Sequence, residues 1–337
     1  MPNRNYNLAI LGANSFRGKE IKNLIEKAAF PLRNIEFFDF SVKEEWSLLT
    51  EFKNEAKIVR YPDENYLEDI DLIFLVSDTE FNKEWGKKAK KKKIFAIDLE
   101  FTFNEEENIP LIVDGVNEEL LKFDDYIVAN PHPIAIILSL VFNFFEKNFK
   151  IKKAISIFYQ PVSEYQDEGI KEFISQTVGV LNLTQIPKSI FKEQVAFNII
   201  SQVGKVSEDG ITDLEKKIIK ETERILRRSE FFSLSIIQVP VFHSYSSMIY
   251  VEFPEEIPFE EIENRMKKVP FFKIFPLKSD PPTPVSASGE DRIFIKLKKD
   301  PNFPNCYWIW LVADNLRRGC TLNAIQIAKN LLNRFLV

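Results

Sequence analysis

A predicted strand, a sharp turn and a predicted helix meet at Asn130-Pro131-His132-Pro133. The apolar stretch 126–129 predicts a buried strand, and a strongly apolar helix is predicted from residue 134. The two prolines stiffen the turn, and Pro133 suits the first turn of a helix. A helix N-terminus directs backbone N–H groups and the positive end of its dipole at one point, which lowers the pKa of a thiol placed there. The geometry therefore suits a nucleophile.

A second turn with chemical potential follows the predicted strand 8–11. The segment Gly12-Ala-Asn-Ser-Phe-Arg-Gly18 leads into a predicted helix at 19–28, which is the context of a dinucleotide-binding fingerprint. Ser15 replaces the middle glycine, which would let the backbone approach a pyrophosphate. A plain strand-to-helix turn explains the two remaining glycines as well as a nucleotide does. The candidate cofactor-binding residues here are Gly12, Asn14, Ser15, Phe16 and Gly18.

Composition limits the classes of protein to consider. The 337 residues are 45% hydrophobic and 28% charged, with a net charge of −5. This is ordinary globular composition, long enough for two domains, and it gives no electrostatic case for nucleic acid. Two cysteines, Cys306 and Cys320, indicate a reduced, cytoplasmic protein without a disulfide framework. No signal peptide is recognised, and the apolar run 134–142 is too short to span a membrane.

Apolar strands alternate with helices in the first part of the chain. Strands are predicted at 35–40, 70–76 and 94–98, with a helix at 81–92. This alternation predicts a parallel, doubly wound sheet of the Rossmann type. Asp39 and Ser41, at the second strand, leave the choice between NAD and NADP open. Further strands are predicted at 151–160 and 233–241, with a helix at 169–180.

The chain resembles the aspartate-semialdehyde dehydrogenase family in a series of motifs that occur in the same order. The turn at 130–133 resembles that family's Asn-Pro-Asn-Cys, and Tyr159-Gln-Pro-Val-Ser163 resembles its Tyr-Gln-Ala-Val-Ser. The resemblance implies an α/β fold, with an N-terminal Rossmann-type doubly wound parallel sheet and an α+β dimerisation domain. It implies a dinucleotide-binding-type domain at 1–129, completed by a C-terminal helix at 315–337, and a catalytic-type or dimerisation domain at 130–314.

Four positions that the family uses for catalysis carry other residues in this chain. Pro133 stands at the position of the nucleophilic cysteine, and Tyr245 at that of the base histidine. Gln238 and Asn104 stand where the family has arginines for the substrate carboxylate and for phosphate. Tyrosine, with an ordinary pKa of about 10, is a poor base near neutral pH. The resemblance therefore implies a degenerate member of the family.

Other positions match the family. Gln160 matches the glutamine that orients the acyl-enzyme, and Glu215 and Lys217 match residues near the substrate amine. On helical spacing alone, Glu215 and Lys217 are equally well explained as a solvated helix face. Asn315 matches a residue on the nicotinamide side of the cofactor site.

The only two histidines, His132 and His243, lie beside two of the replaced positions. With Tyr245 and Gln160 they are candidates for a new polar site in the vacated pocket, which a small-molecule ligand would occupy. The alternative is that both are incidental polar side chains in an old cleft.

The expected function is that of a family homologue without the parent activity, acting as a non-catalytic or re-purposed homodimer. Losing four groups that act as a unit leaves no route to an acyl-enzyme. The alternative is an NAD(P)-dependent semialdehyde dehydrogenase or oxidoreductase of amino-acid biosynthesis, in the aspartate pathway, with altered catalytic residues. The cofactor expectation is weak binding of NADP or NAD, or none, and no metal, nucleic-acid or membrane partner is expected.

Overall fold

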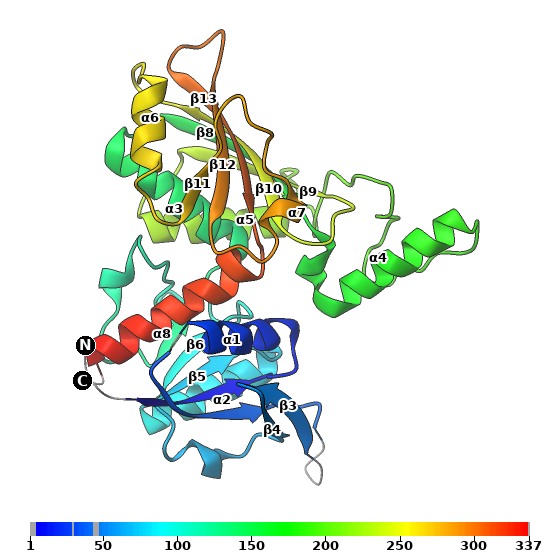
Figure 1. Cartoon of the computed structure of the whole chain (residues 1–337), viewed down its shortest axis with the longest axis vertical. Helices are drawn as coiled ribbons and strands as arrows, with labels where there is room; N and C mark the ends of the chain where they lie inside the picture. Colours follow the sequence, from blue (N-terminus) through cyan, green and yellow to red (C-terminus); the bar gives the residue numbers. More distant parts are fainter. Residues whose placement is uncertain (1–4, 29, 43–46, 336–337) are drawn as a thin grey trace. The chain divides into compact units, whose positions relative to one another are not determined.

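The computed structural model describes residues 5–28, 30–42 and 47–335 (Figure 1). The chain forms two compact units, one made of Met1–His132 with Cys320–Val337 and the other of Pro133–Gly319. Each unit combines helices with one sheet, so the two-domain α/β class expected from the sequence is confirmed. Within the same three stretches, every helix falls short of the length and apolarity needed to span a bilayer.

The described part of the first unit contains a seven-stranded sheet in the order β3-β4-β2-β1-β5-β6-β7. Its strands are β1 (Tyr6–Leu11), β2 (Leu32–Phe38), β3 (Leu48–Phe52), β4 (Glu55–Arg60), β5 (Leu72–Leu75), β6 (Phe95–Asp98) and β7 (Ile127–Ala129). All neighbouring pairs in this part of the sheet are parallel except β3 and β4. Fully buried apolar strands such as β5 are typical of a parallel sheet covered on both faces.

Helices pack on this sheet. α1 (Phe16–Lys27) and α8 (Leu322–Phe335) share one apolar cluster with the strands, whereas α2 (Thr79–Lys92) packs on β5, β6 and β7 outside that cluster. Short helical turns of the first unit are η1 (Glu64–Leu67) and η2 (Glu118–Leu120), and the π-helical η4 (Arg317–Thr321) runs from the second unit into the first. The helix predicted at 315–337 therefore starts as a π-helical turn, continues as α8 to Phe335, and its last two residues lie outside the described part.

The β3–β4 hairpin was not predicted from the sequence. Its two turn residues, Lys53 and Asn54, have φ angles of +52° and +60°. A two-residue hairpin turn of type I′ requires positive φ at both positions and is usually signalled by glycine. Here no glycine marks the turn. The predicted strand 35–40 also ends earlier, at Phe38, which places Asp39 in the loop after β2.

The second unit, all of which is described, has a six-stranded mixed sheet in the order β11-β12-β13-β10-β8-β9. Its strands are β8 (Lys153–Gln160), β9 (Phe232–Gln238), β10 (Tyr245–Glu252), β11 (Phe272–Ile274), β12 (Ile293–Lys299) and β13 (Cys306–Ala313). Its helices are α3 (Pro133–Asn148), η3 (Val162–Tyr165), α4 (Gln166–Leu181), α5 (Asp213–Leu226), α6 (Phe259–Met266) and α7 (Pro284–Ala287). The apolar α3, which is buried over most of its length, packs against α5 and reaches β9 through Phe142 and Phe232.

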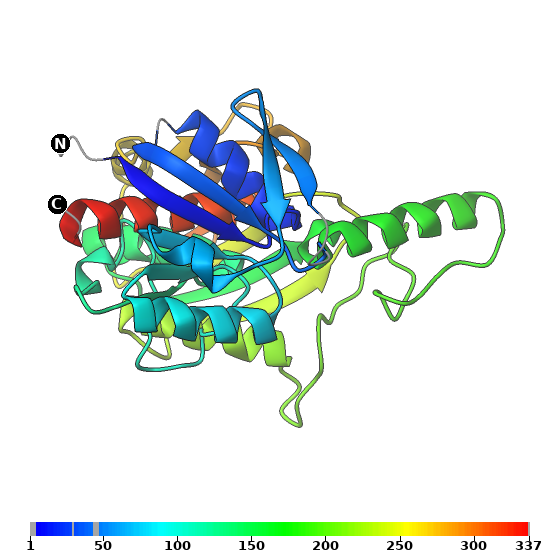
Figure 2. The same cartoon turned by 90° about the horizontal axis from the view of Figure 1, so that it is seen from below.

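The face of the second sheet that lies opposite α3 carries large, half-buried side chains. Met248 of β10 pairs across the strands with Ile157 and Trp310, and Tyr250 pairs with Trp308. The rings of Tyr250 and Trp308 meet edge to face, with centroids 4.7 Å apart. These aromatic and aliphatic side chains lie on one face of the sheet, which we call the outer face. Helix α4 projects away from the same unit (Figures 1 and 2).

Candidate functional site

The glycine turn between β1 and α1 is fixed by close packing. Gly12 has φ +99°, and a Cβ there would lie 2.3 Å from the carbonyl oxygen of Val76. A Cβ on Gly18 would lie 2.2 Å from the carbonyl oxygen of Gly12. Ser15 is the N-cap of α1, and its Oγ accepts a hydrogen bond from Gly18 N at 3.0 Å. Both glycines are thus required by the strand–helix turn itself, and the Ser15 hydroxyl is used in the cap.

The loop after β2 holds a carboxylate against this turn. Asp39, which is buried, accepts a hydrogen bond from Asn14 N at 2.8 Å on one oxygen and from Ser41 N at 2.9 Å on the other. In a doubly wound sheet, an acidic residue at this place faces the ribose of a bound dinucleotide. Two backbone donors from two different loops therefore fix the Asp39 carboxylate.

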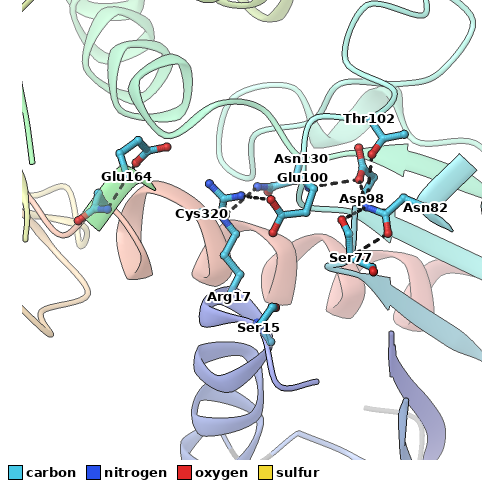
Figure 3. Close-up of polar contacts among 12 residues, drawn as sticks. Ser15, Arg17, Ser77, Asn82, Asp98, Glu100, Thr102, Asn130, Glu164 and Cys320 are labelled. Carbon is cyan, nitrogen blue, oxygen red and sulfur yellow. Dashed lines mark hydrogen bonds and ion pairs between the residues drawn. The ribbon is translucent and has the colours of Figure 1, made fainter. Parts of the chain in front are cut away.

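Arg17, Glu100, Phe101 and His132 form a cluster at the carboxyl ends of β1, β6 and β7. Arg17, the second residue of α1, is buried and forms an ion pair with Glu100 (Figure 3). Its guanidinium carbon lies 4.7 Å from the ring centre of Phe101, whose ring lies 5.2 Å from that of the buried His132. Only His132 among these residues is a candidate from the sequence, because no motif or spacing links Arg17 to a residue 83 positions away.

Asp98 anchors the loops after β5 and β6. It is fully buried, and its carboxylate accepts hydrogen bonds from Phe103 N at 3.1 Å, from Glu100 N at 3.2 Å and from Asn82 Nδ2 at 3.2 Å (Figure 3). Asn82 also donates to the carbonyl oxygen of Ser77. Burial raises the pKa of Asp98 above its ordinary value, and the hydrogen-bond donors offset only part of that effect.

Asn130 anchors the start of the turn at 130–133 through contacts with other residues of the first unit. Its Oδ1 accepts a hydrogen bond from Asn323 Nδ2 of α8 at 2.8 Å, and its Nδ2 approaches Cys320 Sγ at 3.6 Å. Asn104, also buried, places its Nδ2 3.5 Å from the carbonyl oxygen of Asn130, a weak contact. Cys320 is fully buried, so it packs in the core of this unit.

Pro133 is the first residue of α3, as its fixed φ favours. A Cβ on Gly319 would lie 2.9 Å from the Cβ of Pro133. The proline ring therefore packs directly on the backbone of Gly319. This position provides shape and rigidity but no reactive atom.

Gln160, Gln238 and Tyr245 lie together at one edge of the second sheet, at the ends of β8 and β9 and the start of β10. Gln160 Nε2 donates to Gln238 Oε1 at 3.2 Å, and Tyr245 Oη donates to Gln160 Oε1 at 3.3 Å. Gln238 Nε2 also donates to the carbonyl oxygen of Gln160 at 3.0 Å. The three side chains are 1%, 3% and 0% exposed. We call this arrangement the Gln–Gln–Tyr network; it consists of neutral groups that satisfy one another.

Glu215 and Lys217 lie on α5. Glu215 completes a capping box, because its Oε2 accepts from Thr212 N at 2.8 Å while its own N–H donates to Thr212 Oγ1 at 3.2 Å. Its Oε1 accepts from Ile236 N of β9 at 2.9 Å. Lys217 is half-buried. The buried Glu215 therefore joins α5 to β9 and is not part of a solvated face.

Asn315 holds the loop that contains His243. Asn315 Oδ1 accepts from Ser244 N at 3.0 Å and from Ser163 Oγ at 3.3 Å, and its Nδ2 donates to Glu164 at 3.4 Å. Ser244 has φ +74°, a left-handed conformation that is unusual for serine. His243 is half-buried. Since His243 belongs to the second unit and His132 to the first, their joint site stays a prediction.

Within the described residues, no group of three or more histidine, cysteine, aspartate or glutamate side chains is arranged to hold a metal ion. The chemistry available at the Gln–Gln–Tyr network of the second unit is hydrogen bonding by neutral amide and phenol groups. In the first unit the groups are a buried carboxylate, an ion pair and a histidine whose ring is tilted against an aromatic ring.

The chain matches known protein families over most of its length. The family described as "Semialdehyde dehydrogenase, NAD binding domain" matches residues 7–123, and "Semialdehyde dehydrogenase, dimerisation domain" matches residues 144–318. An aspartate-semialdehyde dehydrogenase of Rickettsia conorii is 30% identical over 340 residues, which cover 99% of each chain. The Bacillus subtilis aspartate-semialdehyde dehydrogenase is 28% identical, covering 97% of this chain and 98% of the relative.

Solved structures share the fold. The crystal structure of aspartate semialdehyde dehydrogenase II from Vibrio cholerae complexed with ASA has a TM-score of 0.90 and 25% identity, and the match covers 98% of this chain and 99% of that one. A structure of the Candida albicans enzyme with NADP has a TM-score of 0.73 at 14% identity, covering 98% of each chain. At 14% identity the likeness concerns the fold alone.

Proposed function

Because the chain belongs to the aspartate-semialdehyde dehydrogenase family, we propose that it is a cytoplasmic homodimer that has lost the parent reaction and acts as a non-catalytic or re-purposed homologue. The Gln–Gln–Tyr network carries this proposal. Gln238 and Tyr245, at the positions that match the family's carboxylate-binding arginine and base, are buried and bonded through Gln160. An amide cannot neutralise a carboxylate, and a phenol is a poor base near neutral pH.

Two further positions support the loss of activity. Pro133 has no nucleophilic atom, and its ring packs on Gly319. The carboxylate of Glu215 accepts hydrogen bonds from Thr212 N and Ile236 N, which favours a structural role over binding of a substrate amine. The parent chemistry needs a thiolate, a base and two cations acting together, so repairing one position is not enough.

The proposal assigns residues 1–129 and 315–337 to a dinucleotide-binding-type domain and residues 130–314 to a dimerisation domain. The outer face supports an isologous dimer, because Trp308, Trp310 and Tyr250 present apolar surface on the side of the sheet opposite α3. Helix α4 of the same unit also carries exposed apolar residues, Val178 and Leu181, at 52% and 69%. The expected interface is large and apolar.

The proposed cofactor behaviour is weak binding of NADP or NAD, or none. The family description favours a dinucleotide site, whereas Ser15 occupies the place of the glycine that would admit a pyrophosphate. The alternative function is an NAD(P)-dependent oxidoreductase of amino-acid biosynthesis. Its support is the names of the relatives and the presence of Gln160 at the position that orients the acyl-enzyme.

The deciding experiment measures phosphate-dependent reduction of NADP and NAD by aspartate semialdehyde, with the Bacillus subtilis relative assayed in parallel. We expect no turnover, and a rate above about 1 per second would refute the loss of activity. A variant that rebuilds the four replaced positions should gain measurable activity, although far below that of the relative. Its substitutions are Pro133→Cys, Tyr245→His, Gln238→Arg and Asn104→Arg.

A further inference from the structure

We propose that the chain's own side chains fill the dinucleotide groove of the first unit, with Phe40 stacked on Phe81 at the adenine position and Glu100 paired with Arg17 at the diphosphate position. We further infer that the groove, once these contacts are removed, admits NAD in preference to NADP. The inference deepens the proposed loss of the parent reaction, on which it rests, because it explains how the cofactor is kept out.

The position of the groove follows from the sheet. In a doubly wound sheet a dinucleotide lies across the carboxyl ends of the strands, at the point where the strand order reverses. In this chain β1 lies between β2 and β5, so the loops after these three strands border the groove. The diphosphate belongs at the turn 12–18 and the N-terminus of α1, and the adenine belongs between the loop after β2 and the loop after β5.

An aromatic pair bridges the two loops that would flank the adenine. Phe40 follows Asp39 in the loop after β2, and Phe81 lies in the first turn of α2, directly after β5. Their rings are stacked, with centroids 3.4 Å apart and planes 19° from parallel. Tyr61 meets Phe40 edge to face at 5.8 Å. An adenine ring would need the same apolar contact surface, so it competes directly with this stack.

The carboxylate of Glu100 pairs with Arg17, the positive charge that a bound diphosphate would otherwise contact. Arg17 extends from the first turn of α1, where anions are favoured, and pairs with Glu100 (Figure 3). The two side chains are 7% and 15% exposed, and Phe101 covers the guanidinium. A phosphate must displace the carboxylate and leave it without its cation in a partly buried place, which costs binding free energy.

The carboxylate of Asp39 distinguishes the ribose 2′-hydroxyl of NAD from the 2′-phosphate of NADP. Its oxygens are held by Asn14 N and Ser41 N, so it cannot swing away from the groove. A ribose 2′-hydroxyl can donate to a carboxylate, whereas a 2′-phosphate beside it would be repelled. The opened groove therefore fits NAD.

The test is calorimetric titration of NAD and NADP into the full-length chain and three variants, Phe81→Ala, Glu100→Gln and the double variant. We expect the wild type to bind NAD with a Kd above about 1 mM, near the limit of useful affinity. The double variant should bind NAD at least about tenfold more tightly, and tighter than NADP, because about 1.4 kcal/mol of competition is removed. If the alanine variant does not fold by circular dichroism, Phe81→Leu replaces it.

The matched control is Phe123→Ala. Phe123 is 60% exposed and packs on Phe335, and it precedes β7, so it lies at the amino ends of the strands. This change should leave dinucleotide affinity unaltered. A gain below tenfold in the double variant, or micromolar binding by the wild type, overturns the filled groove, and equal affinity for NADP overturns the role of Asp39. Dehydrogenase turnover would instead refute the proposed function, so the two failures are distinguishable.

Discussion

Tyr245→Phe tests whether the Gln–Gln–Tyr network is structural. The change removes one hydroxyl from a fully buried side chain and leaves the ring in place. The hydroxyl donates to Gln160 Oε1 at 3.3 Å, and Gln160 in turn donates to Gln238. If Tyr245 supports the fold, losing this hydrogen bond should lower the free energy of unfolding. Replacing a residue that is kept for catalysis usually does not lower it.

The magnitude follows from the geometry. A neutral hydrogen bond contributes about 0.5–1.5 kcal/mol net, and a buried acceptor that loses a donor adds part of a desolvation penalty of about 1–3 kcal/mol. Because 3.3 Å is long for a hydroxyl donor, we expect about 1–2 kcal/mol in total. In a unit of about 190 residues, 1 kcal/mol lowers Tm by about 2–4 °C, so the expected decrease is about 2–8 °C.

The assay is differential scanning calorimetry of the wild type, Tyr245→Phe and Tyr159→Phe. Tyr159 is also next to the end of β8 but faces the other side of the sheet, with its ring 6.2 Å from Trp310. Losing its hydroxyl should change Tm by less than about 1 °C. A double-mutant cycle with Gln238→Met should give a coupling of about 0.5 kcal/mol or more.

Tyr245 does not support the fold if Tyr245→Phe leaves Tm unchanged or raises it while Tyr159→Phe behaves as expected. A coupling of zero in the cycle would mean that the two side chains do not act as one network. Either result would favour the oxidoreductase alternative, in which Tyr245 faces a substrate.

Further predictions concern the turn, the buried carboxylate, the glycine contact and the assembly. Pro133→Cys alone should give no turnover in an NADPH absorbance assay, because the thiolate would lack its base and both cations; a rate near that of the fourfold variant would contradict this. The pKa of Asp98 is raised by burial, so the stability it contributes is fully present below its unfolded pKa of about 3.9 and is lost as pH rises through the folded value. Asp98→Asn should therefore show a smaller decline of unfolding free energy above pH 4 than the wild type in urea denaturation, and parallel curves would disprove it. Gly319→Ala should lower Tm by about 2–12 °C, because its methyl group would lie 2.9 Å from Pro133 Cβ and cost about 1–3 kcal/mol; an unchanged Tm would show that the backbone adjusts. Light scattering at micromolar concentration should give about twice the 39.4 kDa chain mass, and Trp308→Glu should shift it to the monomer, so a wild-type monomer would refute the dimer.

The fold was predictable because its strands are short apolar runs separated by helices. Leu72–Leu75 and Phe95–Asp98 are buried on both faces, and the sequence shows the apolar runs 72–75 and 94–97 directly. The β3–β4 hairpin escaped prediction because its strands are half-exposed and charged, and because Lys53 takes a left-handed conformation that glycine normally signals. The turn propensity of the local sequence does not reveal this hairpin, because neither Lys53 nor Asn54 is a glycine although both have positive φ.

The sequence predicted which positions make up the candidate site, but not the contacts between their side chains. The family motifs placed Gln160, Gln238 and Tyr245, but their mutual hydrogen bonds depend on the register in which Gln160 pairs with Gln238. Sequence spacing does not determine that register. The pairing of Arg17 with Glu100 joins a helix start to a loop far along the chain, and the glycine turn that contains Arg17 gives no indication of its partner.

The Phe40–Phe81 stack and the Arg17–Glu100 pair also affect how the stability of the first unit depends on ligand concentrations in the cell. A protein saturated by a ligand at a hundred times its Kd gains about 2.7 kcal/mol, and it loses that gain when the ligand is depleted. Contacts within one chain have no such concentration dependence. The first unit therefore carries a permanent internal substitute for a bound dinucleotide, and its resistance to unfolding and proteolysis should stay constant while the metabolic state of the cell changes the supply of NAD and NADP.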